Sequence, residues 1–174
     1  QTDSLNGMHQ AVQHLIEVHG LQRIAFIRGP QGQSEAEQRY RAYISALEAH
    51  GIPLDEQLVA PGDFNPESGR TAISLLLDER HAGFQAVVTA NDRMAVGVLG
   101  ALQERGFQVP AQVALVGFDD IAEAQALGVP LTTVRQPFYT TGQQAVQQLL
   151  RLIQGETVLS RTILPTELVI RWSC

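Results

Sequence analysis

Two adjacent aspartates, Asp119 and Asp120, are the residues whose type and spacing could most readily do chemistry in this sequence. Neighbouring carboxylates can hold a divalent metal ion or share general acid and general base roles. Such sites normally gather further carboxylates or histidines. The sequence places none beside this pair, so we disfavour catalysis. We expect the Asp119 carboxylate to accept hydrogen bonds from hydroxyl groups of a small ligand, and Asp120 to cap the turn that follows.

A second candidate is Asn91, which directly follows an apolar run. Its amide offers both donors and acceptors, as a ligand rich in hydroxyl groups requires. The alternative role is a helix cap, which is common for asparagine. Asp92 is expected to cap the next helix, and that would leave the Asn91 side chain for the ligand.

The remaining motifs exclude several kinds of site. The loop at 29–34 opens a predicted helix but has neither the Gly-Lys-Ser/Thr ending nor the GxGxxG spacing of nucleotide-binding loops. No GxSxG nucleophile motif occurs. The five histidines show no metal-ligand spacing beyond a weak pair, His9 and His14, and are expected on the surface. The single cysteine, Cys174, allows no intrachain disulfide and no cysteine-based metal cluster. We therefore expect no catalytic residue, no metal and no cofactor.

The composition indicates a globular domain that does not itself bind nucleic acid. Of the 174 residues, 44% are hydrophobic and 17% are charged, and the net charge is -6. Nucleic-acid affinity depends on clustered Lys and Arg, so DNA would be bound only by residues outside this chain. No apolar run approaches the roughly 20 residues that span a bilayer, and the first residues lack a signal-peptide pattern. We expect no membrane contact, a cytoplasmic location, and a chain that is a fragment of a longer protein.

Short apolar runs alternate with longer amphipathic ones, which predicts an α/β fold with a doubly wound parallel sheet. Strands are expected at 24–27, 57–60, 84–89, 113–118, 131–134 and 163–170, and helices at 5–18, 34–50, 66–79, 92–105 and 142–153. The last strand is expected at a sheet edge, because Pro165 cannot donate to a ladder. Ligands bind such sheets at the carboxyl ends of the strands, where the polar residues after each apolar run gather.

Five motifs in order resemble one known family. They are Val88–Gly97 ("ANDxMAxG"), Val113–Asp120 ("VxGFDD"), Pro130–Gln136 ("PLTTVxQ"), Arg39–Leu47 ("RxxGFxxAL") and Leu164–Arg171 ("LPTELVxR"). Within them Ala42 stands where the family usually carries Gly. Over nearly its whole length the chain resembles the effector domain of the lactose-repressor and galactose-repressor group of transcription regulators, which is similar to periplasmic sugar-binding proteins.

The resemblance implies two subdomains that close on a small-molecule effector, a carbohydrate, and thereby control a DNA-binding domain outside this chain. Residues 1–133 would form the C-terminal subdomain. Residues 134–155 would be the strand and helix that cross into the N-terminal subdomain, and 156–174 would return. The family also implies a homodimer.

The resemblance also assigns roles to three further side chains. Arg39 would reach ligand hydroxyls with its planar guanidinium, and its alternative is a solvated helix charge. Arg41 is the residue expected on the surface. Phe64 would stack on the face of a sugar, or else serve as a core or hinge aromatic. Gln136 lies at the expected crossover and would bond the ligand or the hinge backbone.

One difference from the family keeps further functions open. The family usually has "GHxxIA" before its first strand, whereas residues 18–25 read VHGLQRIA. With the stretches at 26–30 and 35–40, this resembles sensor modules joined to diguanylate cyclases or kinases. An exported sugar-binding protein and an α/β enzyme also stay open as functions.

Overall fold

A single six-stranded sheet organises the chain, and the computed structural model describes residues 1–158 and 161–174. The strands lie in the order β2-β1-β3-β4-β5-β6. Their bounds are β1 Ile24–Ile27, β2 Val59–Ala60, β3 Ala86–Thr89, β4 Ala114–Asp119, β5 Thr132–Arg135 and β6 Glu167–Val169. The first five pair in parallel, and β6 pairs antiparallel with β5 at one edge. The predicted α/β class and the edge position of the last strand are confirmed.

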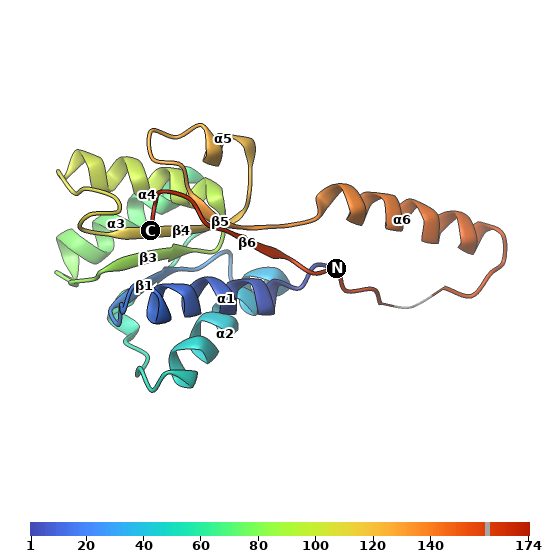
Figure 1. Ribbon diagram of the computed structural model, residues 1–174, viewed down its shortest axis with the longest axis horizontal. Coiled ribbons are helices and arrows are strands. Elements are labelled where there is room, and N and C mark those ends of the chain that lie inside the picture. Colours follow the sequence, from blue (N-terminus) through green and yellow to red (C-terminus); the bar gives the residue numbers. More distant parts are fainter. Residues whose placement is uncertain (159–160) are drawn as a thin grey trace.

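Helices cover both faces of the sheet (Figure 1). Their bounds are α1 Ser4–Glu17, α2 Ser34–Ala49, α3 Pro66–Ser74, α4 Asp92–Glu104, α5 Ala122–Gln125 and α6 Phe138–Ile153. Helices α1 and α2 pack together on one face, and α3 and α4 pack together on the other. This two-sided cover is what defines a doubly wound sheet, and it buries β1 and β3 along their whole length.

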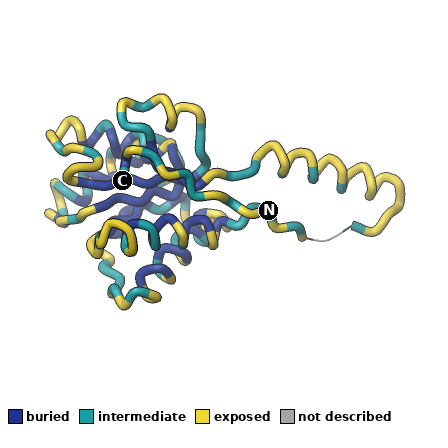
Figure 2. Tube along the Cα trace, viewed as in Figure 1, coloured by how far each residue is buried: buried dark blue, intermediate teal, exposed yellow. Residues whose placement is uncertain are grey.

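Two glycines let α3 and α4 approach backbone to backbone. A Cβ added at Gly97 would overlap the carbonyl oxygen of Pro66, and one added at Gly69 would overlap that of Met94. Figure 2 shows the buried residues concentrated in the sheet and in the inner faces of these helices. These contacts fix the position of α4, whose first turn lies at the carboxyl edge of the sheet, against α3.

Helix α6 projects away from the rest of the molecule (Figure 1). In the part of the chain that the structure describes, none of its residues is buried, and Figure 2 shows it mostly exposed. Its apolar side chains nevertheless recur at helical spacing, with Val146, Leu149, Leu150 and Ile153 all exposed. Such a stripe is typical of a helix that packs against a core, so α6 carries a packing face that the rest of this chain leaves uncovered.

Several elements differ from their sequence-based bounds. The second strand is shorter than predicted, because a 3₁₀ turn at Glu56–Leu58, capped by the Asp55 side chain, occupies its first half. Helix α6 begins at Phe138, one turn earlier than expected, and α5 was not predicted. The last strand shrinks to β6. Among the described residues, no helix is long and apolar enough to cross a membrane.

Candidate functional site

Arg39 lies buried beneath the carboxyl edge of the sheet, with only 4% of its surface exposed. One guanidinium nitrogen donates to the Ala90 carbonyl at 2.6 Å, and the guanidinium carbon lies 3.8 Å from the centre of the Phe118 ring. Among the described residues, Arg39 Nε finds no acceptor. Burial lowers the pKa of Arg39, although the nearby carboxylates oppose this shift. The solvated-charge alternative for Arg39 is therefore wrong, whereas Arg41 is exposed as expected.

Asp119, at the end of β4, faces Arg39 and Gln136. Its Oδ1 lies 3.6 Å from Arg39 Nη2 and accepts a hydrogen bond from Gln136 Nε2 at 2.6 Å. Gln136 Oε1 in turn accepts from the Thr2 hydroxyl at 2.6 Å. Burial raises the pKa of Asp119, while Arg39 and the Gln136 hydrogen bond act in the opposite direction. Both contacts use Oδ1, so within the described chain Oδ2 is left to accept from another group.

Phe64 joins the same edge through an unusual backbone conformation. Its φ is 70°, and those of Asp119 and Asp120 are 119° and 58°. Non-glycine residues seldom adopt such angles, which cost about 1–3 kcal/mol each and cluster at functional sites. The Phe64 ring centre lies 6.0 Å from the Arg39 guanidinium. The ring occupies space that a side chain at Gly29 would need.

Asn91 uses its side chain to organise the edge. Its Oδ1 accepts from Met94 N at 3.0 Å, which caps α4, and its Nδ2 donates to the Phe64 carbonyl at 3.1 Å. The expectation that Asp92 caps this helix is wrong, because α4 begins at Asp92 and Asn91 is its N-cap. Asn91 therefore holds Phe64 in place while it caps the helix.

Asp92 is fully buried and ties α4 to two other elements of the site. Its Oδ1 accepts from the Thr133 hydroxyl at 2.6 Å, and its Oδ2 accepts from Ile121 N at 3.0 Å. Burial raises the pKa of Asp92 to about 6, against the effect of these two hydrogen bonds. A Cβ at Gly117 would overlap the Asp92 carboxylate. Asp92 thus joins α4 to β5 and to the turn after β4.

Asp120 does not cap the turn that follows it, contrary to expectation. Its carboxylate pairs with Arg135 Nε at 2.7 Å and with Arg171 Nη2 at 2.5 Å. Burial alone would raise the pKa of Asp120, but the hydrogen bonds from these two arginines lower it below its ordinary value. No sequence pattern marks this pairing, because Arg171 approaches from the far end of the chain. Asp119 and Asp120 therefore have different roles. Asp119 faces Arg39, whereas Asp120 forms ion pairs with β5 and with the C-terminal segment.

The structure brings all five predicted site residues to one edge. Arg39, Asp119 and Gln136 contact one another in series, Phe64 flanks Arg39, and Asn91 bonds the Phe64 backbone. Phe118 and Thr2 were not predicted to take part. Phe118 belongs to the "VxGFDD" motif directly before Asp119, so its place in that motif could have indicated that it lies at the site. No local pattern marks Thr2.

Comparison with known proteins decides the family. A model of the periplasmic binding protein-like domain matches residues 12–174. This chain belongs to the periplasmic-binding-protein-like domain family. Its relatives include the transcriptional regulator CelR of Thermobifida fusca, 41% identical over 98% of this chain, and the repressor CytR of Escherichia coli, 38% identical over 98%. The resemblance to effector domains of lactose-repressor-type regulators is thus confirmed.

Solved structures of regulators superpose closely on this periplasmic-binding-protein-like domain. A CelR–cellobiose complex has a TM-score of 0.94 at 40% identity, with 99% of this chain and 53% of that chain covered. A lac repressor dimer bound to operator and an anti-inducer has a TM-score of 0.92 at 32% identity, with 99% and 59% covered. The domain spans about half the length of the curated relatives, 50% of both CelR and CytR.

Proposed function

We propose that this chain is the effector-sensing domain of a lactose-repressor-type transcriptional regulator. It binds a small polar ligand, a sugar, in a cleft between the subdomain seen here and a second subdomain. Ligand binding changes the relative orientation of the subdomains and so alters DNA binding by a domain outside this chain. The regulator acts as a homodimer in the cytoplasm, and this domain is not an enzyme.

The observation that carries the proposal is the series Arg39–Asp119–Gln136 at the carboxyl edge of the sheet. A buried guanidinium, a carboxylate with Oδ2 available and an amide supply fixed donors and acceptors for adjacent ligand hydroxyls. The Phe64 ring beside them offers an apolar surface of the kind that a sugar face stacks on. A ligand at this edge would bond directly to groups that the protein already holds in place.

Segments that leave the sheet beside Arg39, Asp119 and Gln136 support the existence of a second subdomain. Gln136 follows β5 and leads into α6, while the N-terminal residues pair with 162–166, as in the bond from Leu164 N to the Gln1 carbonyl at 2.9 Å. Figure 1 shows these segments running toward α6 on one side of the sheet. We assign the residues up to Arg135 to the C-terminal subdomain, because β5 pairs with β4 as far as that residue. The crossover then begins at Gln136, slightly after the sequence-based bound of 134, and runs to 155; residues 156–174 form the return.

The uncovered apolar stripe of α6 supports the same arrangement. Ile153 is 73% exposed and Val146 is 58% exposed. Fully burying one such side chain is worth about 1.5–3 kcal/mol. A second subdomain that packs on α6 would supply that burial.

The known relatives favour a DNA-linked output and a sugar ligand. CelR and CytR are named as transcriptional regulators, and one CelR structure is a complex with cellobiose. These names favour a repressor over a cyclase, a kinase, an exported binding protein or an enzyme. A dimeric relative on its operator supports the homodimer.

The decisive experiment is a thermal-shift screen of the intact protein against sugars, nucleosides and small metabolites. A ligand that binds only the folded state raises the melting temperature. We expect a sugar to raise it, and the Asp119→Ala variant to lose that rise. If Asp119→Ala keeps the rise in melting temperature that a sugar causes, the sugar binds at another site. If no sugar in the panel raises the melting temperature, the effector is not a carbohydrate. Operator binding with and without the hit then tests the DNA link.

A further inference from the structure

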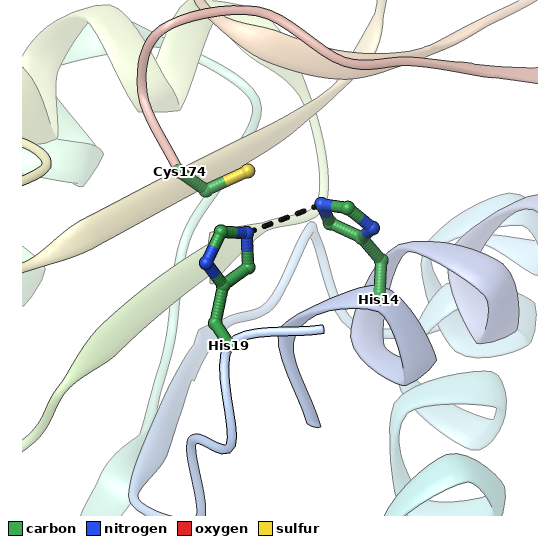
Figure 3. A group of neighbouring side chains, drawn as sticks. All are labelled: His14, His19 and Cys174. Carbon is green, nitrogen blue, oxygen red and sulfur yellow. Dashed lines mark hydrogen bonds between the residues drawn. The ribbon is translucent and has the colours of Figure 1, made fainter. Parts of the chain in front are cut away.

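Two histidines near the end of α1 and a cysteine from the other end of the chain meet on the face opposite α3 and α4. His14 lies on α1, His19 lies in the loop that follows α1, and Cys174 lies in the C-terminal segment; Figure 3 shows their side chains pointing toward one another. The two Nε2 atoms are 3.3 Å apart, and all three ligand atoms lie within 4.8 Å of one another. This group is separate from the Arg39–Asp119–Gln136 series.

The spacing of the two imidazole nitrogens matches that of two ligands on one metal ion. Two nitrogens about 2.0–2.1 Å from a tetrahedral Zn²⁺ lie about 3.3 Å apart. A simple hydrogen bond between two neutral imidazoles would give a similar distance. The thiol favours the metal site, because a hydrogen-bonded histidine pair needs no third group, whereas a zinc ion takes at least three protein ligands and thiolate is one that it prefers.

We propose that His14 Nε2, His19 Nε2 and Cys174 Sγ bind a Zn²⁺ ion, with water as the fourth ligand. Imidazole and thiolate together suit Zn²⁺ better than hard cations such as Mg²⁺ or Ca²⁺. The proposal does not depend on the proposed sensing function. It replaces the sequence-based expectation of no metal, which considered His9 with His14 and had no means of placing Cys174 beside them.

The segment that carries Cys174 is already held in position. Ser173 is buried, accepts from Thr132 N at 2.8 Å and donates to the Leu115 carbonyl at 2.5 Å. The hydroxyl oxygen of Thr132 accepts from Arg171 N at 2.8 Å and lies 3.3 Å from Cys174 Sγ. Its proton is therefore available to the sulfur once the thiol ionises. Such outer hydrogen bonds orient metal ligands and raise affinity.

Metal ligands must be unprotonated: a bound histidine is neutral and a bound cysteine is a thiolate. The ion must therefore displace a proton from Cys174 Sγ when it binds. A surface depression that Gln85 and Gln112 also line opens onto His19 and Cys174. The ion and its water can enter there from solvent.

A bound ion would fasten the C-terminal segment to the end of α1. This helix packs against β5 and β6, and the C-terminal segment continues directly from β6. The ion would therefore act as a clip that ties this edge of the sheet to the helix that covers it.

The test is titration of the intact, reduced protein with ZnCl₂ by calorimetry, and with Co²⁺ as a spectroscopic probe. We expect one ion to bind with release of a proton, and Co²⁺ to give a thiolate charge-transfer band and tetrahedral d–d bands. Cys174→Ser should abolish the charge-transfer band. His14→Ala, His19→Ala and Cys174→Ser should each weaken Zn²⁺ binding at least about tenfold, since loss of even an outer-shell partner costs about 10–100-fold.

His9→Ala is the matched control, because His9 lies on the same helix outside the group, and it should bind Zn²⁺ as the wild type does. His19 is exposed, so His19→Ala should fold normally even if His14→Ala does not. The proposal is overturned if the wild type does not bind Zn²⁺. It is also overturned if Cys174→Ser changes neither the Zn²⁺ affinity nor the cobalt spectrum.

Discussion

Gln136 Nε2 donates a hydrogen bond to Asp119 Oδ1 at 2.6 Å, so the residue at which the chain leaves the sheet is bonded to the acid that faces Arg39. Asp119 takes part in the candidate ligand site, and Gln136 begins the crossover toward α6. A ligand that competes for Asp119, or a movement of the crossover, must change this bond. The site and the expected hinge are therefore in direct contact.

Arg39→Ala should weaken ligand binding by roughly 1–3 kcal/mol, because it leaves buried partners unpaired. Calorimetric titration with the ligand found in the thermal-shift screen measures this loss. Arg41→Ala is the control, since Arg41 lies on the same helix and is exposed. Equal affinities in the two variants would rule out a ligand role for Arg39.

Gln136→Ala should weaken ligand binding less than Asp119→Ala does, by about 1 kcal/mol, the net worth of one ordinary hydrogen bond. It should also alter how strongly the ligand changes operator affinity, because Gln136 joins the site to the crossover. Operator titrations with and without ligand measure that coupling. If Gln136→Ala changes neither the ligand affinity nor the effect of the ligand on operator affinity, Gln136 takes no part in ligand binding or in its coupling to DNA binding.

Asp92→Asn should change the pH dependence of stability. The pKa of Asp92 is about 6 in the folded protein and about 3.9 when unfolded, so its contribution to stability is fully present below about pH 4 and is lost as the pH rises through about 6. As the pH falls from 7.5 to 4.5, the wild type should therefore gain roughly 1–3 kcal/mol relative to Asp92→Asn. Urea unfolding at several pH values measures this difference. Parallel pH curves for the two proteins would show that the Asp92 pKa is ordinary.

Gly97→Ala should destabilise the fold by roughly 1–3 kcal/mol or more, because the new Cβ would overlap the Pro66 carbonyl and force α3 and α4 apart. Gly100→Ala is the matched control: it lies in the same helix, α4, and its Cβ would meet only the flexible end of the Arg70 side chain. There alanine should stabilise the helix by up to about 1 kcal/mol. Thermal melts compare the two, and changes of the same sign would contradict the close packing of α3 on α4.

Leu149→Ala and Leu150→Ala should each destabilise the intact protein by roughly 2–5 kcal/mol if a second subdomain covers α6. Both side chains are more than half exposed here. Gln147→Ala provides a comparison at an exposed polar position of the same helix. Leucine variants as stable as Gln147→Ala would show that α6 stays uncovered in the intact protein.

The sequence was sufficient to predict the sheet and the edge where the site lies. The run at 24–27 reads as a buried strand because a parallel strand is covered on both faces, and the structure agrees. Residues that follow such runs meet at one edge, which is why Asn91 and Asp119 could be chosen together from their place after strands. The roles of Arg39, Phe64 and Gln136 came instead from the motifs shared with the lactose-repressor family.

Contacts between distant segments could not be predicted in this way. Asp120 pairs with Arg171, and Cys174 lies beside His14, because the C-terminal segment returns along the sheet. Neither pair has a sequence spacing that marks it. The choice between Asn91 and Asp92 as the helix cap failed for a related reason: the partner that removes Asp92 from that role, Thr133, belongs to another strand.

The tight fit of Gly117 against Asp92 limits how this family of sequences can diverge. Any side chain at 117 would displace the carboxylate that joins α4 to β5. A lineage that replaces Gly117 must therefore also shorten or remove the acid at 92 and find another partner for Thr133. We expect a change at 117 to occur only together with a change at 92, whereas a change at 92 alone leaves the space of Gly117 undisturbed.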